Sequence, residues 1–201
     1  ARHGIPTAVA LPGVGANLQD HYECPVVATT NGAYGYYGQD KGLKMILAGL
    51  QYLLFKSGPV TTTGVESCAF VDPTGQGGRP TIQMFCVPTV YLDRDVMGAD
   101  PGHGVTINAL LLQPKSRGTV RLRSADPDDL PCVDPQIFGH PDDLATTMQG
   151  FRFARRVLDQ APLRDLITRE IFPGADVTSD AAIADHCRRT VKTGYHPVGT
   201  C

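Results

Sequence analysis

Apolar residues recur with two different periods along the chain, and these periods predict where strands and helices lie. Runs that alternate or are wholly apolar predict β-strands at residues 5–11, 24–30, 65–71, 81–87, 105–112 and 119–122. A Tyr- and Gly-rich stretch at 31–40 and the turn-forming residues at 72–78 indicate loops between them.

Three other segments show the three- and four-residue spacing of helices. In the segment 42–56 the apolar residues form one face, which we expect to be buried: Leu43, Ile46, Leu47, Leu50, Leu53 and Leu54. A second helix is expected at 141–160, with His140 or its neighbours as the cap, an apolar stripe facing inward and the arginines facing outward. Ser179 predicts the start of a third helix at 180–192.

Consecutive strands followed by helices predict an α+β fold, in which an antiparallel sheet carries helices on one side. The link at 114–118 is short enough for a hairpin-like connection. We therefore expect the strands at 105–112 and 119–122 to be antiparallel neighbours.

Composition narrows the class of protein. Apolar residues make up 42% of the chain and charged residues 19%, which is typical of a globular domain, and no apolar run approaches the ~18–20 residues of a transmembrane segment. The net charge of −2 with scattered basic residues argues against nucleic-acid binding. The six cysteines form no CxxC pair, so we expect no metal site, and a cytoplasmic location is the working expectation.

Two glycine-containing segments could carry chemistry. Gly13 and Gly15 resemble a dinucleotide-binding turn, but Leu18 stands where a third glycine is needed and Pro12 lies inside the turn, which argues against a phosphate loop. Near the other end, Pro197 keeps His196 out of the helical conformation. An imidazole held on such a turn can act as a general base near neutral pH, or it can serve as a capping or core residue.

Five collinear motifs add a family resemblance. They are LPGVGANLQDH at 11–21, YLL to SGP at 52–59, GVE at 64–66, PKSRGTVRLRS at 114–124 with DP at 134–135, and YHPVGTC at 195–201. Together they resemble the glucose-methanol-choline (GMC) oxidoreductases, and they cover essentially the whole chain. The resemblance implies an internal part of a longer protein, with the FAD-binding domain largely missing and FAD bound mainly by segments that this chain lacks.

By that resemblance, residues 1–22 are the exit from the FAD-binding domain, 23–192 are the substrate-binding domain, and 193–201 begin the return into the FAD-binding domain. The implied activity is oxidation of the CH–OH group of a small-molecule alcohol, with His196 as the acid/base residue and hydride passing to the flavin. The electron acceptor is left open, and the chain alone is expected to be inactive.

Two further residues are candidates for substrate binding, each with a structural alternative. Glu66 matches a position where some family members carry a pocket carboxylate, which would suit a cation such as choline, but an ion pair or a hydrogen bond inside the sheet is the commoner explanation for such a residue. Tyr195 could line the pocket or pack in the core. Two other functions stay open: a cyanohydrin lyase of the same family, and a non-catalytic binding module derived from the substrate domain.

Overall fold

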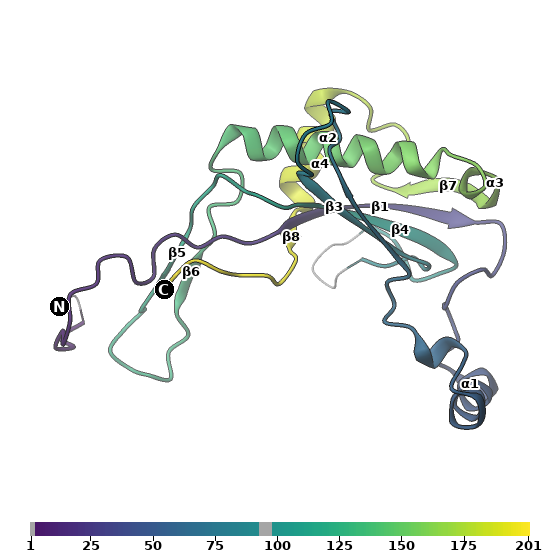
Figure 1. Cartoon of the computed structure of the whole chain (residues 1–201), viewed down its shortest axis with the longest axis horizontal. Helices are drawn as coiled ribbons and strands as arrows, with labels where there is room; N and C mark the ends of the chain where they lie inside the picture. The colour runs from purple at the N-terminus through teal and green to yellow at the C-terminus, as the bar shows by residue number, and fades with distance from the viewer. Residues whose placement is uncertain (1–2, 93–97) are drawn as a thin grey trace.

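The computed structural model describes residues 3–92 and 98–201, and its centre is an antiparallel sheet of six strands (Figure 1). The strands are β1 (Tyr22–Thr30), β2 (Ser67–Val71), β3 (Ile82–Val87), β4 (Gly104–Leu111), β7 (Ile167–Phe172) and β8 (Lys192–Thr193). Their order is β2-β3-β4-β1-β7, and β8 also pairs with β1. The predicted antiparallel sheet is therefore confirmed.

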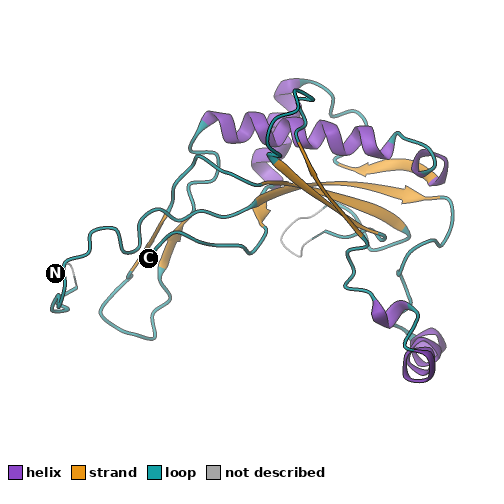
Figure 2. Ribbon diagram, in the orientation of Figure 1, coloured by secondary structure: helices purple, strands orange, loops and turns teal. Residues whose placement is uncertain are grey.

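Helices cover one face of this sheet. They are α2 (Pro141–Leu158) and α4 (Asp180–Thr190), and the short α3 (Leu163–Leu166) follows α2 (Figure 2). Because strand side chains alternate, Val26 of β1 and Ile107 of β4 point to the same face and join Phe151 of α2 in the core. The helix at 42–55 projects away from the sheet, so the described helices that pack on the sheet, α2 and α4, lie on one face, and this confirms the α+β arrangement with helices to one side (Figure 1).

The caps of these two helices are as predicted. His140 accepts a hydrogen bond from the backbone N–H of Asp142, and Ser179 accepts one from Ala182. The prediction that the arginines of α2 face outward is wrong for Arg155. Its guanidinium is largely buried and bonds Glu170 at 2.7 and 2.9 Å, because that carboxylate gives it a partner inside the fold.

The expected pairing of 105–112 with 119–122 is wrong. β4 lies between β3 and β1, whereas β5 (Thr119–Arg121) pairs with β6 (Cys132–Asp134) in a separate two-stranded sheet. The link between them is held elsewhere, because the buried carboxylate of Asp143 accepts the backbone N–H groups of Lys115 and Ser116, each at 2.8 Å. These bonds fix the link at the start of α2 and take the chain out of the main sheet.

The first helix is present but its predicted burial is wrong. α1 (Gly42–Phe55) precedes a short 3-10 helix, η1 (Pro59–Thr61), and projects away from the sheet (Figure 1). All six residues of the expected core face are exposed, and the one buried residue of α1 is Ala48. Among the described residues no helix has both the length and the apolar character to cross a membrane.

The strand expected at 5–11 is also wrong. These residues form turns and irregular chain, and Ile5, Val9 and Leu11 are exposed. An alternating segment forms a β-strand only where a neighbouring strand supplies hydrogen-bond partners. From the N-terminal side, the first backbone hydrogen bond to a distant segment is donated by the N–H of Gly15. The domain boundaries at 22 and 192 stay predictions.

Candidate active site

Two segments that are far apart in the sequence run side by side to build the site. The backbone N–H of Gly15 donates to the carbonyl of Thr200 at 2.8 Å, and Gln19 and Val198 exchange two bonds of 2.9 Å. Further along, the N–H of Gly194 donates to the carbonyl of His21 at 2.6 Å. This pairing brings the two histidine-containing motifs together.

The turn that carries His196 has an unusual backbone. Tyr195 has a φ of 62°, a value that residues other than glycine rarely adopt, and Gly199 has a φ of 93°. A Cβ on Gly199 would also collide with the carbonyl oxygen of Asn17, so glycine is required where the two segments meet. Strained residues of this kind persist only where the surroundings hold them, and they are frequent at functional sites.

The carboxylate of Asp20 fixes much of the backbone of this turn. Asp20 is 9% exposed, and its Oδ1 accepts the backbone N–H groups of His21 and His196, each at 2.8 Å. Its Oδ2 accepts the hydroxyl of Thr193, whose Oγ1 in turn accepts the backbone N–H of Tyr195 at 2.9 Å. Asp20 therefore fixes both histidines through their main chains.

The two imidazoles are in direct contact. Nδ1 of His196 lies 3.1 Å from Nδ1 of His21, with the ring centroids 5.1 Å apart and the ring planes at 85°. Burial, followed by the nearby charge of His196, lowers the pKa of His21, while a backbone hydrogen bond to Leu112 and the charge of Asp20 partly oppose this. A lowered pKa favours neutral His21 at physiological pH.

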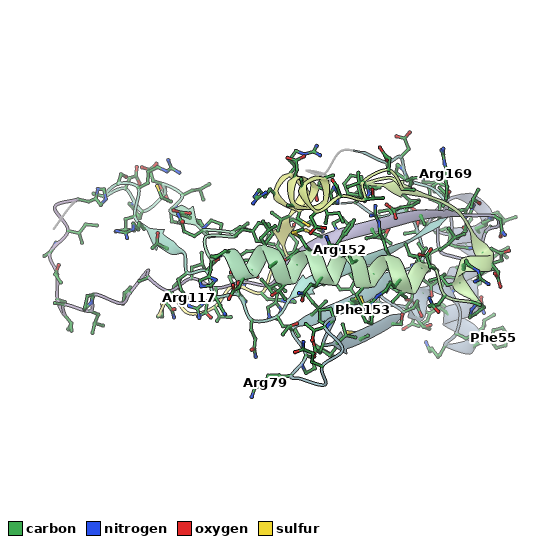
Figure 3. All side chains as sticks on the ribbon, turned by 90° about the horizontal axis from the view of Figure 1, so that it is seen from above. Phe55, Arg79, Arg117, Arg152, Phe153 and Arg169 are labelled. Carbon is green, nitrogen blue, oxygen red and sulfur yellow. The ribbon has the colours of Figure 1, made fainter. Side chains whose placement is uncertain are left out.

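A cavity of about 440 Å³ opens beside this pair. Its lining combines the two histidines and Asp20 with two cationic side chains and a few neutral groups: Gln19, Leu112, Gln113, Pro114, Lys115, Arg117 and Val198. Figure 3 shows Arg117 beside the first turn of α2 (Figure 3). A larger cavity of about 520 Å³ lies between the N-terminal segment and β5, and its lining is mostly apolar. The 440 Å³ cavity is the one of these two that brings His196 together with an acidic side chain and a second histidine of the paired segment.

The structure separates the sequence-predicted site residues. Tyr195 is adjacent to His196 but 71% exposed, and it is outside the set of residues that line the 440 Å³ cavity. Glu66 is exposed and directly precedes β2, so the expected burial in the sheet is wrong, whereas the expected hydrogen bonding of its carboxylate is present. Hydrogen bonds from Thr62 and from Tyr36, the latter at 2.6 Å, lower the pKa of Glu66 and keep it anionic.

Sequence reasoning assigned no role to Asp20 and His21, although both lie inside the LQDH motif. Their contact with His196 spans about 175 positions and depends on the pairing of the two segments. The available signal was the presence of an acidic residue and a second histidine in one of the two end motifs.

Comparison with known proteins decides the family. The family model described as GMC oxidoreductase matches residues 114–201, which include the cavity residues Lys115 and Arg117 as well as His196. Residues 114–201 of this chain therefore belong to the GMC oxidoreductase family. The resemblance inferred from the sequence motifs is thereby confirmed.

Curated relatives extend the similarity over nearly the whole length of the chain. It is 36% identical over 99% of its residues to an alcohol dehydrogenase [acceptor] of Pseudomonas putida. It is 35% identical over 98% to a chloroplastic fatty acid photodecarboxylase of Chlamydomonas reinhardtii, and 35% identical over 99% to an oxygen-dependent choline dehydrogenase of Brucella canis. The chain spans only 35–36% of the length of these relatives.

A solved structure supports the same fold. The formate oxidase of Aspergillus oryzae, in a study of FAD modification, aligns with 100% of the chain at a TM-score of 0.83 and 25% identity. The aligned part is 40% of that protein. The antiparallel sheet and its helices therefore correspond to one part of a GMC oxidoreductase.

Proposed function

We propose that this chain is part of an FAD-dependent oxidoreductase that oxidises the CH–OH group of an alcohol, with His196 as the acid/base residue. The observation that supports this most is the placement of the His196 imidazole. It lines a cavity, it is anchored through its backbone to Asp20, and its ring contacts a second imidazole. An anchored imidazole with access to a cavity is suited to proton transfer near neutral pH.

The cavity also suits the charge that develops during such a reaction. When the hydroxyl proton leaves for His196, negative charge grows on the substrate oxygen. Lys115 and Arg117 line the same cavity, and cationic groups near a developing oxyanion lower the barrier. The Arg117 guanidinium is held by the carbonyls of Pro114 and Ser116 at 2.6 and 2.9 Å, so its position is fixed in advance.

The residues present fit one part of FAD. On the turn of His196, the side chains of Tyr195 and Val198 are exposed and offer aromatic and apolar surface on which a flat ring system can pack. The Gly13–Gly15 turn leads into extended chain that pairs with Gly118 instead of into a helix, so it offers no helix N-terminus to phosphates. When bound, the flavin supplies the acceptor for the hydride of the carbinol carbon.

The proposal extends to Tyr195 and Glu66 as substrate contacts outside the cavity. Tyr195 is exposed beside the catalytic position, and Glu66 is an exposed carboxylate that would attract a cationic alcohol. The name of one relative, oxygen-dependent choline dehydrogenase, agrees with a substrate of that class. Weaker saturation by choline in Glu66→Gln, with an unchanged response to a neutral alcohol, would support this role.

The test of the function uses the full-length protein with its flavin. It is mixed without oxygen with a panel of primary alcohols that includes choline, and the flavin absorbance is followed. We expect bleaching by at least one alcohol. A cyanohydrin is included because its cleavage without any bleaching would contradict the oxidoreductase proposal and favour a lyase.

A further inference from the structure

One side of α1 forms an exposed apolar surface. At 3.6 residues per turn, six apolar residues fall within an arc of about 120° around the helix axis. They are between 47% and 71% exposed, and we call them the α1 face: Leu43, Ile46, Leu47, Leu50, Leu53 and Leu54. Ala48, the buried residue of α1, lies on the opposite side of the helix. The α1 face therefore points away from the rest of the described chain, in line with the projection of α1 from the sheet (Figure 1).

An apolar surface of this kind indicates a site of contact. Contiguous exposed apolar side chains on a globular domain are typical of surfaces that bind a protein or a membrane. The α1 helix has 14 residues and is therefore about 21 Å long. Because the apolar core of a bilayer is about 30 Å thick, a helix of this length suits the surface of a bilayer and not a crossing.

The charges beside the α1 face are all positive. Lys41 directly precedes α1, Lys44 lies in its first turn and Lys56 directly follows it, and all three are exposed. From residue 41 to residue 65 the sequence contains no aspartate or glutamate, although the whole chain has a net charge of −2. Lysines beside an apolar face bind the phosphate groups of anionic lipids, and their aliphatic stems lie along the apolar surface. The charge pattern therefore complements an anionic bilayer.

The same charges disfavour a second copy of this chain as the occupant. In a symmetric dimer the two α1 faces would pack on one another. The lysines of both copies would then meet without any carboxylate from the same segment to pair with them. An anionic bilayer supplies both partners of the surface at once, because its acyl region takes the leucines and its phosphates take the lysines.

We propose that the α1 face is a docking surface for an anionic lipid bilayer. The helix lies parallel to the plane of the bilayer, and the leucines of the α1 face enter the boundary between headgroups and acyl chains. Lys41, Lys44 and Lys56 contact lipid phosphates at the same depth. This contact goes beyond the proposed function and does not depend on it, because α1 contributes no residue to the lining of the 440 Å³ cavity.

The first test uses the wild-type full-length flavoprotein. It is mixed with vesicles of phosphatidylcholine alone and with vesicles that also contain phosphatidylglycerol, and the bound protein is measured by cosedimentation. We expect binding to the anionic vesicles, weaker binding to the neutral ones, and a loss of binding as the salt concentration is raised. Failure to bind the anionic vesicles, or equal binding to both kinds, would overturn the inference.

Substitutions on α1 locate the contact. Leu47→Glu and Leu50→Glu each place a carboxylate on the α1 face, and each should weaken binding to anionic vesicles by about 10-fold or more. Lys44→Gln combined with Lys56→Gln should weaken it by roughly 10- to 30-fold. Leu130→Glu is the matched control and should bind like the wild type, because Leu130 is 79% exposed and lies outside α1. Wild-type binding by flavin-loaded Leu47→Glu and Leu50→Glu would contradict the inference.

Hydrogen exchange of the wild-type protein decides the question even if these variants fail to fold. We expect amide exchange in peptides that cover residues 42–55 to slow when anionic vesicles are added, while exchange in β3 and β4 stays the same. Protection at another segment but not at α1 would overturn the inference. If a second copy or another part of the protein covers the α1 face, exchange there is already slow without vesicles and does not change when they are added. That outcome would overturn the inference as well.

Discussion

The two helices α1 and α2 carry similar apolar periodicities and occupy opposite environments. In α2 the apolar stripe lies on the sheet, and Phe151 is completely buried between β-strands and α4. In α1 the equivalent face is exposed, and Phe55 at its end is 73% exposed. Figure 3 shows Phe153 on α2, over the sheet, and Phe55 at the far end of the molecule. Periodicity predicts that a helix forms, but it does not say what covers it.

The largest expected effect is on the free energy of unfolding when a core side chain of α2 is removed. The same substitution at an exposed phenylalanine of α1 is the comparison. Phe151→Ala should lower the free energy of unfolding by about 3–5 kcal/mol, because it leaves a cavity against the sheet. Phe55→Ala should change it by less than about 0.5 kcal/mol. Urea denaturation followed by fluorescence or circular dichroism measures both. Equal losses would show that the two helices are equally covered.

Two ion pairs made by arginines of α2 should differ as well, because one is buried and the other exposed. The Arg155–Glu170 pair is 17% and 14% exposed, whereas the Arg152–Asp180 pair is 39% and 89% exposed. Arg155→Met leaves a carboxylate without its partner in the fold and should cost about 3 kcal/mol, while Arg152→Met should cost less than about 1 kcal/mol. Denaturation midpoints give the order, and the reverse order would contradict the burial of Arg155.

The packed side of the sheet should also give the protein its pH sensitivity. Burial, followed by the charges of Arg189 and Arg155, lowers the pKa of His186 to about 4 from 6.5. Its stabilising contribution is therefore complete above pH 6.5 and is lost as the pH falls toward 4, by up to about 3 kcal/mol. Unfolding measured between pH 7 and pH 4 should show this slope. It should be shallower in His186→Leu, and an identical slope there would rule out His186 as its source.

The smallest expected effect is on α1. Leu53→Lys adds a charge to an exposed face and should change the free energy of unfolding by less than about 0.5 kcal/mol. A cost above about 2 kcal/mol in the full-length protein would mean that residues outside this chain pack on α1. The apolar face of α1 would then be buried in an interface, as the face of α2 is, and the contrast between the two helices would not hold.

Much of the fold was predictable because its main strands and helices are long enough to show a clear hydrophobic periodicity in the sequence. The strands β1, β3 and β4 and the helices α2 and α4 occur within a few residues of their predicted positions. By contrast, β7 carries three polar residues in the sequence Thr168-Arg169-Glu170, and β8 has only two residues, so neither shows a strand pattern. The pairing of β5 was missed because it depends on Asp143, a residue of a different element.

The candidate site was predictable only in part, and for a similar reason. Pro197 and the flanking glycines mark His196 as a residue on a fixed turn, and this is visible in the local sequence. The partners of His196 come from the segment at 15–21 and reach it through long-range backbone pairing. No local pattern encodes that pairing, so Asp20 and His21 become meaningful only in the folded chain.

The most direct test of the central claim is the rate of flavin reduction by an alcohol substrate in His196→Ala, measured by anaerobic rapid mixing of the full-length protein. His103→Leu, which removes a histidine that packs on Tyr37 and does not line the 440 Å³ cavity, is the control. We predict a fall of about 10²- to 10⁴-fold for His196→Ala with the flavin still bound, and a much smaller change for His103→Leu. A wild-type rate in flavin-loaded His196→Ala would contradict the assignment of His196 as the acid/base residue.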